Sequence, residues 1–284
     1  MLFKLKFKGL FDGFVIKDLF VLLIFPTIIT LLMLLPDSIR IGMMFNIKDP
    51  HWWQFLSSGF IHQTWSHLKN NLIGYFLFVF PLFFLITTRT SKKIYYFKFL
   101  IFISLTFPII SSIFRIYFYP NIFPNLIYLT GSSGIIAAFS GLIPSFWLLS
   151  VANRNKLRIK KKFALINIFY LILSLLFVYY SLYKNLYLIL IPILLFISLL
   201  FFYRKGILSI LIEISKETQR NFILALILIL VPILFVFTPK FFFPKLSVLV
   251  NNGTFTDFLV HYLGIAYGLI VSFYFFIFVH KETK

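Results

Sequence analysis

The sequence predicts an all-α, polytopic membrane protein, and three observations support this fold class. Hydrophobic residues make up 61% of the 284-residue chain, charged residues make up only 12%, and the mean hydropathy is +0.97. No soluble domain of this size carries so much apolar surface, so the solvent of the chain is a bilayer. A spanning helix needs about 20 apolar residues to cross about 30 Å of hydrocarbon, and eight apolar runs come close to this length.

Charged or turn residues separate the eight predicted spans. The spans cover residues 19–36, 67–88, 97–118, 133–152, 163–182, 186–203, 221–238 and 256–279. The division between the fifth and sixth spans rests on the short segment YKNL at 183–186, which leaves room only for a tight helical hairpin. We expect a single transmembrane domain over residues 1–284, with no internal repeat and no separate soluble domain.

The basic residues favour one orientation of these spans. The chain has 27 Lys and Arg against 8 acidic residues, a formal net charge of +19. With eight spans, 20 of the 27 fall in segments 1–18, 89–98, 153–162, 204–220 and 280–284, all on the same side. The positive-inside rule then predicts an integral protein of the cell membrane with both termini in the cytoplasm. The charge therefore requires no nucleic-acid partner.

Two long connections fall on the predicted outer side. Residues 37–66 include the aromatic stretch HWWQF at 51–55, and interfacial tryptophans predict that this loop lies at the boundary of the outer leaflet. Residues 239–255 form the second connection. The chain has no cysteine, which excludes a disulfide, a thiol nucleophile and a thiolate metal site.

Polar residues at the outer end of the second span are candidates for function, because ionisable groups in a bilayer are costly. His67 and Asn71 are four residues apart and share one helix face, and His62 comes just before the helix. Taken alone, these residues are more simply interpreted as hydrogen-bonding groups between helices, worth about 1 kcal/mol each.

Small residues line one side of two further spans. In the last span, Gly264 and Gly268 follow His261 at three and seven residues. In the fourth span, which begins at Ser133, residues 134 and 138 and residues 137 and 141 are glycine or alanine at spacings of four. Such stripes allow two helix backbones to approach closely. We therefore expect the two helices to pack together, with Ser133 and His261 both near the outer surface.

A serine within reach of a histidine can act as a nucleophile, because the imidazole takes the hydroxyl proton during attack. Acyl transfer also needs donors for the oxyanion, and the free amides at the start of the Ser133 helix, with His67 and Asn71, could supply them. Water must reach the serine as well. We therefore expect a polar cavity open to the outside, lined by Ser132, Ser133, His67, Asn71 and His261.

Three motifs resemble those of the rhomboid intramembrane serine proteases. They are GSSG at 131–134, HQTWSHLKNN at 62–71 and HYLGIAYG at 261–268, in the order that this family shows. The resemblance implies a rhomboid-like core of six helices, over about residues 15–152 and 256–279. An extra helical pair would lie within residues 163–238 and would leave both catalytic groups facing outward.

The resemblance also implies a role for each matching residue. Ser133 would be the nucleophile and His261 the general base and acid of a dyad, with no metal or cofactor. His67, Asn71 and the Ser133 amide would bind the oxyanion. Structural support would come from His62, Gly131, Gly134, Gly264 and Gly268. The expected partners are the lipid bilayer and transmembrane protein substrates with helix breakers and a small residue near the outer end of the span.

Three alternatives stay open at this point. The family often has an arginine where this chain has Gln54 and an aromatic residue where it has Ala137, which keeps possible a catalytically inactive relative that escorts membrane helices. Asp257 could complete a triad with His261, although it is more simply interpreted, together with Thr256, as one of two residues that could cap the last helix. A transporter would need a charged midplane site, which only Arg115 suggests. A metalloprotease is disfavoured because the chain has no H-E-x-x-H motif.

Overall fold

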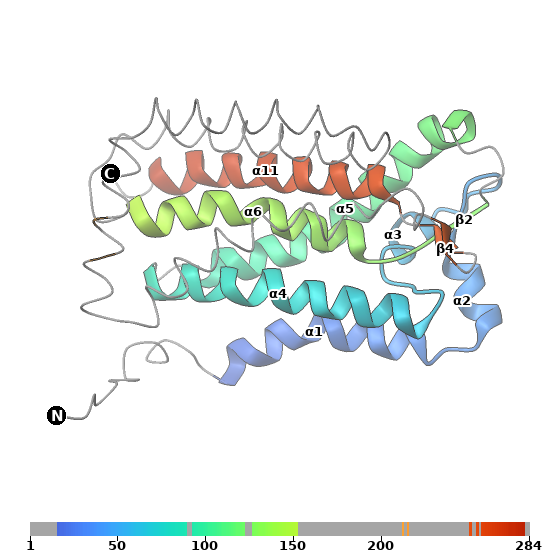
Figure 1. Cartoon of the computed structure of the whole chain (residues 1–284), viewed down its shortest axis with the longest axis horizontal. Helices are drawn as coiled ribbons and strands as arrows, with labels where there is room; N and C mark the ends of the chain where they lie inside the picture. The colour runs from blue at the N-terminus through green and yellow to red at the C-terminus, as the bar shows by residue number, and fades with distance from the viewer. Residues whose placement is uncertain are drawn as a thin grey trace.

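The computed structural model of the chain describes residues 16–89, 93–122, 127–152, 212, 215, 250–251, 254–255 and 257–281 (Figure 1). This part of the chain is mostly helical, so the expected helical class is confirmed in that coarse form. It also contains four two-residue strands, which the all-α prediction did not include and which lie in the connections between helices.

Five long helices match predicted spans. They are α1 (Ile16–Met33), α4 (Trp65–Arg89), α5 (Lys93–Ile122), α6 (Ser133–Ala152) and α11 (Phe258–Lys281). The helix α6 has the predicted bounds, and the other helices begin or end within a few residues of them. The predicted spans at 163–182, 186–203 and 221–238 lie outside the described residues.

One described helical stretch, Tyr96–Ile122 within α5, is long and apolar enough to cross a bilayer. Shorter apolar helical stretches cover Asp18–Met33, Ser133–Trp147 and Phe258–Ser272. Prolines lie inside α1, α4 and α5, at positions 26, 81, 108 and 120. Neighbouring helices make such prolines tolerable, because their polar groups can satisfy the carbonyls that the prolines leave without a donor. In α1, Pro26 cannot donate to the Leu22 carbonyl, and the Tyr75 hydroxyl of α4 donates to it instead, at 2.7 Å.

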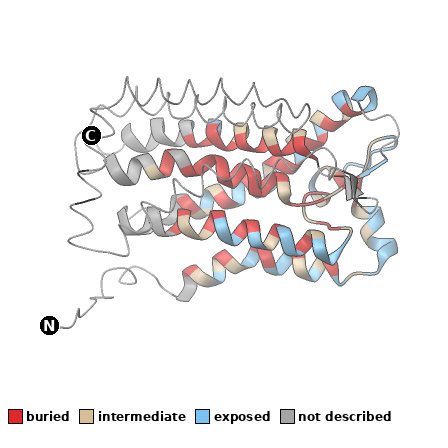
Figure 2. Ribbon diagram, in the orientation of Figure 1, coloured by how far each residue is buried: buried red, intermediate tan, exposed pale blue. Residues whose placement is uncertain are grey.

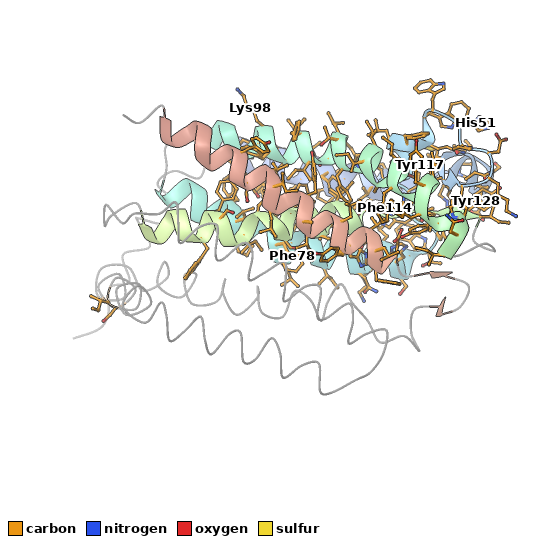
Figure 3. The ribbon with its side chains drawn as sticks, turned by 90° about the horizontal axis from the view of Figure 1, so that it is seen from above. His51, Phe78, Lys98, Phe114, Tyr117 and Tyr128 are labelled. Carbon is orange, nitrogen blue, oxygen red and sulfur yellow. The ribbon has the colours of Figure 1, made fainter. Side chains whose placement is uncertain are left out.

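The connections that we expected on one side of the membrane gather at one end of the helical bundle (Figure 1). The helices α1 and α5 end there, whereas α4, α6 and α11 begin there. Figure 3 shows His51 and Tyr128 at this end and Lys98 toward the other. The end of α6 and the start of α11 lie toward opposite ends of the bundle.

Short elements join the connections at this end. The loop after α1 contains α2 (Asp37–Met43), β1 (Phe45–Asn46) and α3 (Gln54–Ser57). The strand β1 pairs antiparallel with β2 (Tyr128–Leu129), which directly precedes α6. A second antiparallel pair, β3 (Val250–Asn251) and β4 (Thr254–Phe255), precedes α11. The starts of α6 and α11 therefore each follow a strand pair.

The core of the described bundle centres on α6, which is buried along most of its described length (Figure 2). Phenylalanine and tyrosine side chains from the surrounding helices pack around it. Phe139 of α6, for example, makes edge contacts with Phe25 of α1 and Tyr75 of α4. Tyr75 keeps its hydroxyl satisfied by donating to the Leu22 carbonyl at 2.7 Å.

The closest helix contact is between α6 and α11, and it is made by backbone atoms. A Cβ atom on Gly264 would overlap the Gly134 carbonyl oxygen, and one on Gly268 would overlap the Ala138 carbonyl oxygen. From the other side, a Cβ on Gly141 would lie 3.1 Å from the Cα of Gly268. The packing that we expected from the small-residue stripes is therefore confirmed.

We expect Gly268→Ala to weaken this contact strongly. The added methyl group would meet the Ala138 carbonyl, so the two helices must move apart, at a cost of about 1–3 kcal/mol in the free energy of unfolding. Gly42→Ala in α2 is the matched control, because nothing lies within 4 Å of the Cβ that it adds. Unfolding in detergent, followed by circular dichroism, measures both variants. Equal stability of the two would contradict the packing.

Candidate active site

The site is built around the turn that opens α6. Gly131 has a φ of +114°, a backbone conformation that residues with a side chain rarely adopt. Its amide donates to the Ser58 carbonyl at 3.0 Å. A Cβ at this position would also lie 2.6 Å from Cε1 of His67. The turn thus requires glycine for its conformation and for the close approach of the His67 ring, and it places Ser132 and Ser133 at the start of the helix.

The two serines have different surroundings. Ser132 is fully buried, and its hydroxyl lies 3.2 Å from Nε2 of His62. Ser133 is half-buried. We expected both residues to line an outward cavity, and for Ser132 this was wrong, because its side chain turns into the protein to bond His62. Of the two serines, Ser133 is therefore the more exposed.

The packing of α6 and α11 brings Ser133 and His261 to similar heights along the bundle. Ser133 lies one helical turn before Ala137, whose Cβ would be 3.1 Å from a Cβ on Gly264, and His261 lies three residues before Gly264. One level nearer the helix starts, a Cβ on Gly134 would lie 2.6 Å from Cγ1 of Val260. The two helices run in the same direction, so Ser133 and His261 are at about the same height.

His62 is the centre of a buried polar cluster. Its Nε2 atom lies 2.7 Å from the Asn71 amide nitrogen and 3.2 Å from the Ser132 hydroxyl. Both neighbours can donate, so Nε2 acts as the acceptor and the ring is neutral. Burial, with a smaller contribution from His67, lowers the pKa of His62 from 6.5 to about 3. His62 therefore joins α4 to the α6 turn as an uncharged group.

His67 lies between this cluster and α11. Its ring centroid is 5.1 Å from that of His62 at an angle of 75°, and its Cε1 and Nε2 atoms face Gly131. His67 is also close enough to His261 for their charges to interact. The structure thus brings His62, His67 and Asn71 to the α6 turn, with His261 within electrostatic range of His67. Their roles in binding an oxyanion stay a prediction.

Asp257 caps α11. Its Oδ1 atom accepts the Val260 amide at 3.1 Å, which is the hydrogen bond of a helix cap. The same carboxylate binds Arg115 of α5 through Nε at 3.1 Å and Nη2 at 2.9 Å, and the Tyr119 hydroxyl donates to it as well. The capping interpretation is confirmed, and these donors occupy both carboxylate oxygens that a triad with His261 would use.

Gln54 occupies the position where the family has an arginine. It is buried, and its Oε1 atom accepts the amides of Asn46 and His51, both at 3.2 Å. Its amide nitrogen donates to the Gly42 carbonyl at 3.1 Å. Gln54 thus binds the last turn of α2 and two points of the loop between α2 and α3. Next to it, the His51 ring stacks on Trp53 with centroids 4.5 Å apart.

Two arginines organise the site through contacts that were not predicted from the sequence. Arg40 donates to the His62 carbonyl at 2.9 Å and to the Gln63 carbonyl at 3.3 Å, and so holds the segment before α4. Arg115 holds the start of α11 through Asp257. A signal was present, since both arginines fall on the predicted outer side, where the positive-inside rule does not explain them. Their partners were not visible in the sequence.

Within the described part of the chain, no group of His, Asp and Glu has an arrangement that could hold a metal ion. Comparisons with family models, with curated proteins and with solved structures find no match to this chain. The functional interpretation therefore depends on the three motifs and on the geometry that the fold gives them.

The neutral state of His62 predicts a pH dependence of stability. Because the folded-state pKa of about 3 lies below the usual 6.5, the unfolded chain binds the extra proton between these values. The contribution of His62 to the free energy of unfolding is therefore fully present above pH 6.5. It is lost as the pH falls toward 3, with a slope of up to about 1.4 kcal/mol per pH unit. His62→Asn removes the titrating group.

Unfolding midpoints in detergent between pH 4 and about 7 measure this effect, and the difference between wild type and variant isolates His62 from the other titrating groups. The wild type should lose stability more steeply than His62→Asn as the pH falls. Parallel curves for the two proteins would show that His62 is not held neutral by the fold.

Proposed function

We propose that the chain is an intramembrane serine protease of the rhomboid type, which cleaves peptide bonds in or near the transmembrane segments of other membrane proteins. The observation that carries the proposal is the glycine-lined contact of α6 and α11, whose register supports Ser133 and His261 at one height on neighbouring helices. The half-buried Ser133, beside fully buried Ser132, supports the choice of nucleophile.

In the proposed reaction, the Ser133 hydroxyl attacks the scissile carbonyl carbon while His261 takes the hydroxyl proton. The oxyanion is bound by the Ser133 amide, His67 and Asn71. As the carbon–nitrogen bond breaks, His261 passes its proton to the leaving amine. Water then attacks the acyl carbon while His261 accepts a proton from it. The bond between that carbon and Oγ of Ser133 breaks, which releases the new carboxyl end of the substrate, and the proton returns from His261 to Oγ of Ser133. The reaction uses no metal or cofactor.

The departures from the family pattern have a local explanation. An aromatic side chain at position 137 would have no room, because Ala137 lies against the backbone of α11 at Gly264. Gln54 and Arg40 hold the loop before α4 by several hydrogen bonds, which supports a built outer loop without the family's arginine. A catalytically inactive protein that escorts membrane helices remains the second candidate, since a preserved fold does not by itself preserve activity.

The proposal includes eight spans in one domain, with both termini in the cytoplasm of the cell and the site open to the outside. The one candidate span of α5 and the shorter apolar helices support a membrane location. The gathering of the connections between helices at one end supports the alternation of spans. Its partners would be lipid and transmembrane substrates, and the number of copies in the assembly stays open.

A fluorophosphonate probe tests the nucleophile in detergent. We expect labelling of the wild type and none of Ser133→Ala, because the probe reacts only with an activated hydroxyl. His261→Ala should slow labelling by ~100-fold or more, the loss typical of a missing general base. Ser132→Ala is the matched control, and Ser133 should still be labelled in it. A folded wild type that is not labelled and does not cut a model transmembrane substrate would instead favour the escort function.

Single cysteines test the orientation, because the chain has none of its own. His51→Cys and Lys98→Cys place thiols on exposed residues toward opposite ends of the bundle (Figure 3). A membrane-impermeant thiol reagent applied to intact cells should label His51→Cys, and it should label Lys98→Cys only after permeabilisation. Labelling of both variants from the same side would contradict the proposed topology.

A further inference from the structure

The ion pair between Arg115 and Asp257 is buried at the end of the bundle that carries the site. Arg115 is 3% exposed, Asp257 is 6% exposed and Tyr119 is fully buried. Two donors of Arg115 bind Oδ2 of Asp257, while the Tyr119 hydroxyl and the Val260 amide bind Oδ1. Because Arg115 and Tyr119 are four residues apart on α5, one face of α5 supplies both side-chain donors.

This cluster is linked directly to the turn that carries His261. Asp257 immediately precedes α11, its side chain caps the amide of Val260, and its main-chain carbonyl accepts the His261 amide at 3.1 Å. Any shift of Asp257 along the bundle or around the helix axis therefore moves the first turn of α11. His261 lies in this turn.

A second contact between α5 and α11 lies beyond His261. The hydroxyl groups of Thr106 and Tyr267 are 2.7 Å apart, and the rings of Phe107 and Tyr267 have centroids 5.7 Å apart. Phe107 also lies against α6, where its Cε1 atom would be 2.7 Å from a Cβ on Gly134. The helix α5 thus contacts α11 on both sides of His261 and contacts α6 one residue after Ser133.

By itself, the contact of α6 with α11 defines the height of one helix along the other less sharply than a directional contact would. It is lined by glycine and alanine, which project little into the neighbouring helix. A buried ion pair adds little net stability, because desolvation offsets its attraction, but it is directional and can select one register. Three of the four hydrogen bonds to the Asp257 carboxylate come from α5, two from Arg115 and one from Tyr119, and they hold Asp257 at one position along that helix.

We propose that Arg115 is a positioning residue, which acts through Asp257 to set the height of His261 relative to Ser133. This inference rests on the proposed function for its catalytic consequence, although the placement itself can be measured without activity. Removal of the pair should leave α6 and α11 packed while the first turn of α11 shifts. Such misplacement of a general base lowers the rate of reaction without weakening substrate binding.

Two variants distinguish the loss of the ion pair from the loss of the helix cap. Asp257→Asn keeps an oxygen that can cap the helix but removes the partner of Arg115, and the uncompensated buried charge can prevent folding. Arg115→Met with Asp257→Asn removes both charges and keeps the cap, so this double variant is the main test. A third variant, Arg115→Lys with wild-type Asp257, keeps the positive charge with fewer hydrogen-bond donors. Its rate of reaction with the fluorophosphonate probe should lie between that of the wild type and that of the double variant.

Disulfide cross-linking in the cysteine-free chain measures the placement. Ser133→Cys with His261→Cys reports on the proposed dyad. The matched control is Ser145→Cys with Ser272→Cys, since these hydroxyls of α6 and α11 are 2.6 Å apart farther along the same helices. In the neutral double variant, we expect severalfold slower cross-linking at 133 and 261 and an unchanged rate at 145 and 272.

Three outcomes would overturn the proposal. If the 133 and 261 pair does not cross-link in the otherwise unchanged protein, the placement is wrong. If the neutral variant leaves that rate unchanged, the ion pair does not position His261. If both pairs slow equally, the ion pair only stabilises the bundle, because the disturbance is not confined to the first turn of α11.

Fluorophosphonate kinetics then give the catalytic consequence. Per folded molecule, the neutral variant should react ~10-fold to ~100-fold more slowly at saturating probe, with unchanged half-saturation. An unchanged rate per folded molecule would contradict the positioning role. If wild type does not react at all, the protease proposal fails, while the cross-linking still decides whether Arg115 positions residue 261.

Discussion

The structure depends on the direct approach of two helix backbones, α6 and α11. Gly264 and Gly268 lie against the carbonyl oxygens of Gly134 and Ala138, so no side chain separates the helices there. In lipid, where apolar burial gives little advantage to helix association, such packing is a main source of attraction between helices. It also determines which turns of the two helices lie side by side, and so the approximate relative height of Ser133 and His261.

The end of the bundle that carries these residues is held by polar contacts rather than by apolar packing. Gly131 is bonded to Ser58, and β2 is paired with β1, so the α6 turn is tied to the loop that precedes α4. Asn71 and Ser132 meet at one nitrogen of His62. Because buried polar groups are costly when they lose a partner, these contacts favour one arrangement of the turn.

The helix α5 has a different part in this arrangement. It contacts α11 through the ion pair near its own end and through Tyr267 farther along, and it reaches α6 through Phe107. Contacts at separate levels resist both sliding and rotation of a helix, which a single contact does not. The two helices that carry the proposed dyad are therefore held against each other and against a common third helix.

Local sequence patterns were sufficient for the helices and for several features of the site. Apolar runs gave the positions of α1, α4, α5, α6 and α11, because a helix in lipid needs an uninterrupted apolar length. Small residues at spacings of four predicted the contact of α6 with α11, and an acid before the last helix predicted its cap at Asp257. Each of these features depends on residues close together in the chain.

Apart from the contact of α6 with α11, the contacts between distant segments were decided only by the tertiary structure. The pairing of β1 with β2, the burial of Ser132 against His62 and the ion pair of Arg115 with Asp257 join residues 70 or more positions apart. Periodicity shows which face of a helix is apolar, but it does not show which distant group will meet a buried charge. That choice depends on how the helices pack, because a buried polar group must find its partner among whatever side chains the packing brings near it.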